Sequence, residues 1–209
     1  HLRTRRQRQM CIRDRAGSYR LFFRNIRAND KGEFSEVTEA ADGELFADNM
    51  IRYSPRRITV PPRSKQNVRV VLRKPPSLES GEYRSHLVFR KLPKQQSVLD
   101  QGVEENSVGF SLRPIVEVTI PVIVRHGDTD ATMQISEAKL ETTAGDAPTV
   151  HLTIQRDGSR SLYGDVDVWW MKNDGKKQNV GMAKGIAVYS PNPIRLFELP
   201  LDINDLSLI

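Results

Sequence analysis

Cysteine is nearly absent from this 209-residue chain, and so are long apolar runs. The single cysteine, Cys11, lies in an arginine-rich N-terminal segment. The body therefore has no cysteine pair for a disulfide, no thiolate metal site and no cysteine nucleophile. No run of about 18 apolar residues occurs, so we expect no membrane-spanning segment.

Recognisable catalytic and cofactor motifs are also missing. The four histidines are neither at the His-x-His nor at the His-Glu-x-x-His spacing of metal sites, and no Gly-x-Ser-x-Gly elbow or glycine-rich phosphate loop is present. Asp165 and Asp167 share one strand face, which is more typical of a solvent face than of acid–base catalysis. We predict that the chain is not an enzyme and uses no cofactor and no metal.

Positive charge is concentrated at the N-terminus. The formal net charge is +6, and residues 1–15 carry six arginines against Asp14, which leaves 26 basic and 25 acidic residues in the rest. The charges of the body are expected to be interspersed over its surface. Residues 1–17 have no apolar core of a secretory signal and are predicted to be a disordered or non-native basic segment. A basic arm for nucleic acid or a membrane surface is the alternative for this segment, but we expect no nucleic-acid partner.

From Ser18 onward the chain is predicted to be all-β. Short alternating or β-branched segments recur about every ten residues between turn signals, and no segment has helical periodicity, which favours β-sandwiches over βαβ units. Asn173-Asp-Gly175 predicts a hairpin turn, and His86 is expected to be partly solvated. The predicted strands are 19–26, 50–54, 57–60, 67–73, 82–90, 110–126, 133–140, 149–155, 164–171, 180–187 and 195–199.

Residues 110–126 contain the most informative pattern. Every even position from Phe110 to Val124 is apolar, so one long strand with a continuous apolar stripe is predicted. Pro114 and Pro121 indicate a strand at a sheet edge, because proline has no N–H to donate to a neighbour. An apolar edge strand is an aggregation hazard. It is therefore either covered by the protein's own second sheet or used to pair with another chain.

Two stretches of sequence resemble the PapD-like periplasmic chaperones of pilus and fimbria assembly. One is Tyr53-Ser-Pro-Arg-Arg-Ile-Thr-Val-Pro-Pro-Arg-Ser-Lys-Gln-Asn-Val-Arg-Val followed by Gly81-Glu-Tyr-Arg-Ser-His-Leu-Val-Phe-Arg; the other runs from Lys184 to Leu201. The resemblance implies two immunoglobulin-like β-sandwich domains in an L arrangement, at residues 18–126 and 127–209. It also implies a periplasmic location and a role in fimbrium biogenesis and cell wall organisation. The implied partners are pilus or fimbrial subunits and an outer-membrane usher.

The resemblance further implies donor-strand complementation, in which the chaperone lends an alternating strand to a subunit that lacks its own last strand. The lending strand maps onto residues 110–124, and the implied subunit-binding residues are Leu112, Pro114, Val116, Val118 and Ile120.

The chain departs from the family in two places. The family holds the subunit's terminal carboxylate with an arginine and a lysine; the arginine's strand has no counterpart here, and the lysine position falls at Pro121. Arg113 and Arg125 are the basic residues nearby and are the candidates for carboxylate contact. The first domain is expected to be incomplete at its N-terminus, with exposed apolar side chains around Leu21. The alternative function is a structural or adhesive sandwich protein, such as a fibre subunit.

Overall fold

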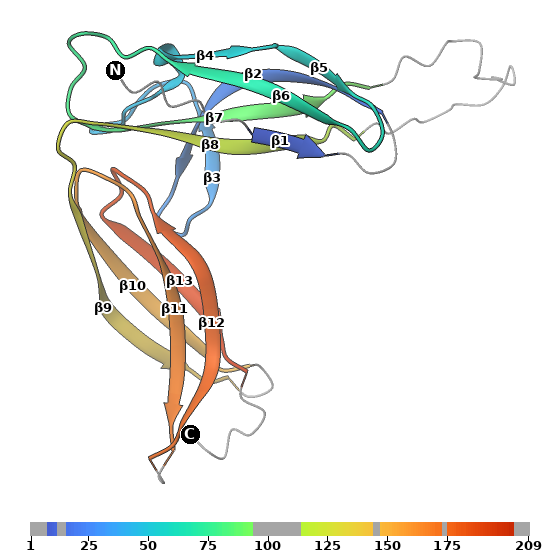
Figure 1. Ribbon diagram of the computed structural model, residues 1–209. Helices are drawn as coiled ribbons and strands as arrows, with labels where there is room; N and C mark the ends of the chain where they lie inside the picture. The colour runs from blue at the N-terminus through green and yellow to red at the C-terminus, as the bar shows by residue number, and fades with distance from the viewer. Residues whose placement is uncertain (1–7, 12–15, 94–113, 144–146, 173–174, 203–209) are drawn as a thin grey trace, which may run out of the picture. The chain divides into compact units, whose positions relative to one another are not determined.

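The computed structural model describes residues 8–11, 16–93, 114–143, 147–172 and 175–202. Its elements are strands and one 3-10 turn, so the predicted all-β fold class is confirmed for this part of the chain (Figure 1). The strands are β1 (Arg8–Cys11), β2 (Gly17–Ala28), β3 (Phe34–Val37), β4 (Ile51–Ser54), β5 (Arg57–Val60), β6 (Lys65–Leu72), β7 (Gly81–Lys91), β8 (Glu117–His126), β9 (Ala131–Glu141), β10 (Thr149–Gly158), β11 (Leu162–Met171), β12 (Lys177–Val188) and β13 (Ile194–Pro200).

The chain divides into two compact units. The first holds the described residues of 1–24, 47–76 and 84–122, and the second holds those of 25–46, 77–83 and 123–209. The division at 122/123 lies inside β8, close to the domain boundary that the sequence predicts after residue 126. That boundary stays a prediction.

The first unit is a β-sandwich. One sheet has the order β1-β6-β4, and the facing strands belong to a sheet of order β3-β2-β7-β8 in which β5 also pairs with β2. The alternation of β5 and β6 places Ile58, Val60 and Val68 in the core between the sheets. Tyr53 of β4 crosses this core, because its hydroxyl donates to the Leu21 carbonyl of β2 at 3.1 Å.

Two sequence expectations about the first unit are wrong. Leu21 was expected to be exposed, yet only 2% of its surface is accessible. Residues 8–11, inside the segment expected to lie outside the fold, form β1 and pair antiparallel with residues 65–68 of β6. The main-chain ladder explains this pairing, since any non-proline segment can hydrogen-bond to an edge strand without an apolar pattern of its own.

The second unit is also built from two sheets, one of order β13-β10-β9 and one formed by the hairpin β11-β12. Its core contains Leu152, Ile154 and Val188 at one end and Val180, Leu199 and Leu201 at the other. The predicted hairpin between β11 and β12 is confirmed by their antiparallel pairing, although Asn173 and Asp174 of its turn lie outside the described residues. Trp170 packs on the core while Trp169 is exposed, as their opposite faces predict.

Arg156 of β10 holds two connecting segments of the second unit in place, the one between β10 and β11 and the one between β12 and β13. This buried guanidinium donates to the carbonyls of Gly158, Arg160, Pro191 and Asn192 at 2.6–3.2 Å. Burial lowers the pKa of Arg156, while the negative charge of Glu82 opposes this shift. Several carbonyls that no strand ladder satisfies are thus paired by one side chain.

Candidate functional site

Among the described strands, β8 lies at the edge of its sheet, next to β7, as the prolines of the predicted 110–126 strand indicate (Figure 1). The strand begins at Glu117 rather than at residue 110: residues 114–116 have no regular structure, and residues 110–113 lie outside the described part. One ladder bond still precedes the strand, from Lys91 N to Val116 O at 2.9 Å. Pro121 is exposed, and its missing N–H costs little at an edge position.

The apolar stripe of β8 changes its environment along the strand. At the C-terminal end of the strand Val124 is buried. Ile120 and Val122 are partly buried and pack against the core of the first unit. Toward the N-terminal end the exposure rises, to 44% at Val118 and 52% at Val116. The even positions therefore form core at one end of the strand and an uncovered apolar surface at the other.

The predicted subunit-binding residues differ in how much of their surface is exposed. Val116 and Val118 are exposed, and Pro114 is exposed as well, whereas Ile120 is half-buried against the first unit's own core. Leu112 and Arg113 lie outside the described residues. Ile115, which precedes β8, is also exposed.

The opposite face of β8 carries an ion cluster centred on Glu117. Its carboxylate accepts a hydrogen bond from Arg24 Nη1 at 2.9 Å and another from Arg90 Nε, and both guanidinium groups stack on Phe22, 5.3 and 5.0 Å from the ring centroid. Burial raises the pKa of Glu117, but the hydrogen bonds and charges of Arg90 and Arg24 outweigh it, so the net pKa is lowered. The cluster fixes the start of β8 to β2 and β7 and keeps that face polar.

Arg125, one of the two candidates for carboxylate contact, is already engaged within the second unit. Its Nε donates to Glu82 Oε2 at 2.9 Å, and the Glu82 side chain is 1% exposed. Glu82 also accepts from the Ser161 backbone N–H at 3.1 Å and from the Ser161 hydroxyl. A buried carboxylate needs such partners, and Glu82 therefore joins β7, β8 and the loop before β11.

His86 of β7 is buried, and the expectation that it is partly solvated is wrong. It lies opposite Arg24 of β2, on the same face of the strand as Arg84, which is also buried. Desolvation, reinforced by the positive charge of Arg84, lowers the pKa of His86 to about 4. The imidazole is consequently neutral at physiological pH.

The carboxylates of Asp165 and Asp167 lie on a solvent-exposed strand face, as the sequence predicts. Asp165 and Asp167 are exposed; one accepts a hydrogen bond from the Gly185 N–H and the other from the Asn179 amide. Within the described residues, no group of three or more histidine, cysteine or acidic residues is arranged to hold a metal ion. The same part of the chain contains no helix long and apolar enough to cross a membrane.

Comparisons with known proteins give structural similarities only. No protein-family model and no curated protein matches the sequence. A solved structure described as a chaperone–tip adhesin complex of CFA/I fimbriae biogenesis is similar at 10% identity and a TM-score of 0.46, over 97% of this chain and 87% of that one. The class 5 fimbriae chaperone CfaA is similar at 12% sequence identity and a TM-score of 0.44, over 98% of this chain and 89% of CfaA. The CupB2 chaperone of Pseudomonas aeruginosa is similar at 11% sequence identity and a TM-score of 0.43, over 95% of this chain and 81% of CupB2. Similarities of this size do not assign a function, which has to be argued from the chain's own residues.

Proposed function

We propose that this protein is a periplasmic chaperone that captures pilus or fimbrial subunits by donor-strand complementation and passes them to an outer-membrane usher. The observation that carries the proposal is the edge strand β8, whose apolar stripe continues beyond the core to the exposed Val116 and Val118. The sequence resemblance to PapD-like chaperones supports it independently, because it maps the lending strand onto the same residues.

An exposed edge with alternating apolar side chains suits the last-strand groove of an incomplete sandwich. Knobs at every second residue are spaced about 6.6–6.8 Å apart, which matches the repeat of a neighbouring strand. The free edge would form a main-chain ladder with the subunit, each bond contributing about 0.5–1.5 kcal/mol. Covering the exposed half of Val116 and of Val118 would contribute roughly 0.8 kcal/mol each. Pro114 and Leu112 extend the row of knobs, whereas Ile120 would act mainly by fixing β8 to its own core.

A terminal carboxylate of the subunit would be bound by an arginine in place of the family's missing pair. If the lending strand is extended throughout on binding, Arg113 and Arg125 would be about 40 Å apart, so a given carboxylate would contact only one of them. Arg125 is about half exposed and is positioned by Glu82. Its guanidinium can offer a carboxylate a planar, charge-assisted contact. Arg113 would serve if the carboxylate lies at the other end of the lending strand.

The test is co-expression in a bacterial periplasm with a fimbrial subunit encoded beside this chain. We expect a one-to-one complex in size-exclusion chromatography and slower amide hydrogen exchange at residues 114–120 in the complex. A subunit supplied with its own last strand in cis is the matched control and should not bind, because its groove is filled. Binding of both subunits to the same extent, or protection confined to other strands, would refute donor-strand complementation. Self-polymerisation of this chain alone would favour the fibre-subunit alternative.

A further inference from the structure

The sheet β1-β6-β4 of the first unit presents a cationic face. Residues 51–76 contain eight basic residues and no acidic one, so the expectation that the body's charges are interspersed is wrong here. All eight are exposed. They are Arg52, Arg56, Arg57, Arg63, Lys65, Arg69, Arg73 and Lys74.

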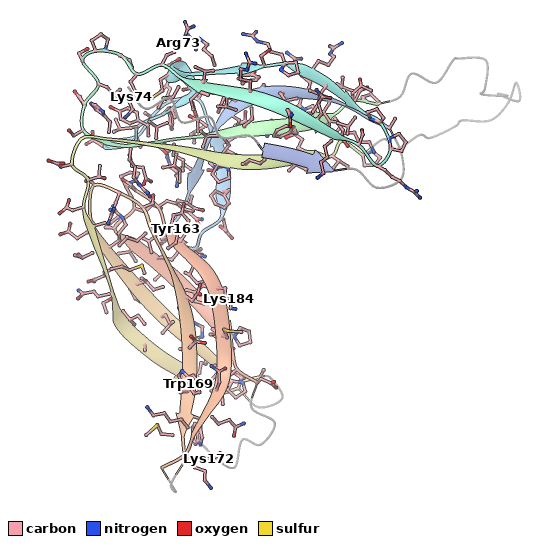
Figure 2. The ribbon with its side chains drawn as sticks, viewed as in Figure 1. Arg73, Lys74, Tyr163, Trp169, Lys172 and Lys184 are labelled. Carbon is pink, nitrogen blue, oxygen red and sulfur yellow. The ribbon has the colours of Figure 1, made fainter. Side chains whose placement is uncertain are left out.

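Strand geometry aligns the central members of this group. Lys65, Arg69 and Arg73 lie at positions of the same parity along β6 and its extension, so they share the outer face and follow one another at about 13 Å. A bond from Arg73 N to Met50 O at 2.8 Å continues the ladder past the end of β6. Arg52 of β4 pairs with Val71 between Arg69 and Arg73. Arg73 and Lys74 are labelled in Figure 2.

This face lacks the carboxylates that neutralise arginines elsewhere in the protein. Arg24 and Arg90 share Glu117, and Arg27 pairs with Glu44. By contrast, no salt bridge within the described residues involves Arg52, Arg69 or Arg73; the Arg52 guanidinium donates only to nearby carbonyls of the chain. On the outer face of β4, β6 and its extension, Arg52, Arg69 and Arg73 therefore form a row of positive charges without a salt bridge in the described part of the chain.

We propose that this face docks the protein onto an anionic phospholipid surface, a property that goes beyond subunit capture and does not depend on it. Exposed cations on one strand face can contact several lipid phosphates at once, and each cation near such a surface contributes to binding. Val71, 42% exposed, lies on the same outer face of β6 as these cations and offers aliphatic contact with the interface. No exposed aromatic side chain lies on the described part of β4 or β6 to stack bases, which disfavours single-stranded nucleic acid as the ligand.

The experiment uses the full chain and sedimentation with vesicles of phosphatidylcholine, with and without 30% phosphatidylglycerol. Because the arginines of residues 1–15 could bind anionic lipid themselves, every variant carries Arg3, Arg5 and Arg6 replaced by Gln. In this background we expect binding to the anionic vesicles only, and weaker binding in high salt. Each cation near the surface should contribute about fivefold to the affinity for anionic vesicles. Replacing Arg52, Arg69 and Arg73 together by Gln should therefore lower this affinity about a hundredfold.

Two control variants make the outcome specific. Replacing the exposed Lys139, Lys177 and Lys184 of the second unit by Gln removes the same net charge and should leave the affinity nearly unchanged. Replacing Arg52, Arg69 and Arg73 by Lys should retain binding, which separates loss of charge from loss of folding. The proposal is overturned if both Gln variants lose affinity equally, if the Arg-to-Gln variant binds normally, or if uncharged vesicles bind as well. It is also overturned if inorganic polyphosphate binds more tightly than anionic vesicles at equal phosphate concentration.

Discussion

Replacing Val116 or Val118 by Asp tests the lending strand directly. In a subunit groove, either carboxylate would be buried without a partner. An uncompensated buried charge costs about 3–5 kcal/mol, which corresponds to a loss of affinity of roughly two to three and a half orders of magnitude. The cost to the protein's own fold is much smaller. About half of each side chain is already exposed, so each substitution removes roughly 0.8 kcal/mol of apolar burial from the first unit.

The assay combines subunit co-purification with thermal unfolding monitored by circular dichroism. We expect Val116→Asp and Val118→Asp to melt within a few degrees of the wild type and to capture no subunit. Thr119→Asp, on the other face of β8, is the matched control and should keep most of the affinity. Val122→Asp should unfold the first unit, since Val122 packs against its core. Folded Asp variants that still capture subunits would refute the donor role; variants at 116 and 118 that unfold would show that the stripe is ordinary core.

Three further predictions concern stability. Glu82→Gln should lower the free energy of unfolding by about 1–3 kcal/mol in urea titration, because Ser161 and Arg125 lose a charged acceptor; no change would show that these contacts contribute nothing. His86 has a folded pKa of about 4 against about 6.5 when unfolded, so stability should be fully present above pH 6.5 and fall by roughly 3 kcal/mol as the pH drops to 4. His86→Gln should flatten that profile, and an unchanged profile would contradict the assignment. Arg156→Lys should destabilise the second unit nearly as much as Arg156→Gln, because an ammonium group cannot reproduce the planar fork that reaches four carbonyls; recovery by lysine in thermal unfolding would show that charge alone matters.

Much of the fold follows from the period-two pattern and the turn residues. Residues 57–60 are predicted and observed as β5, and most other predicted strands are recovered with small shifts at their ends, whereas the strand predicted at 110–126 is observed only from Glu117. The edge position of β8 was readable from Pro121, because the absent N–H excludes a neighbour on that side. Such local rules work where one residue type decides the backbone pairing.

Burial of the polar face of β7 was not predictable in the same way. Alternation shows that Arg84 and His86 share a face, but it does not show what covers that face. The cover depends on the register with β2, which places Arg24 opposite His86. The role of Glu82 was missed for a similar reason, since its partner Ser161 is 79 residues away in sequence. The excess of basic residues in 51–76, in contrast, can be counted directly from the sequence. The net charge of the whole body, which is close to zero, does not reveal it.

The division of β8 explains how one apolar stripe can serve two purposes. Ile120 and Val122 attach the strand to the core of the first unit, so the strand is held before any partner arrives. On the other face, the contacts of Arg24 and Arg90 with Glu117 hold the strand's first residue between the half-exposed Val116 and Val118. Binding a partner strand then requires little ordering of β8, and the conformational entropy that association would otherwise cost is reduced. An apolar edge strand that was loosely held would be an aggregation hazard, whereas under the proposed function one fixed at both faces would be a template for a single partner strand.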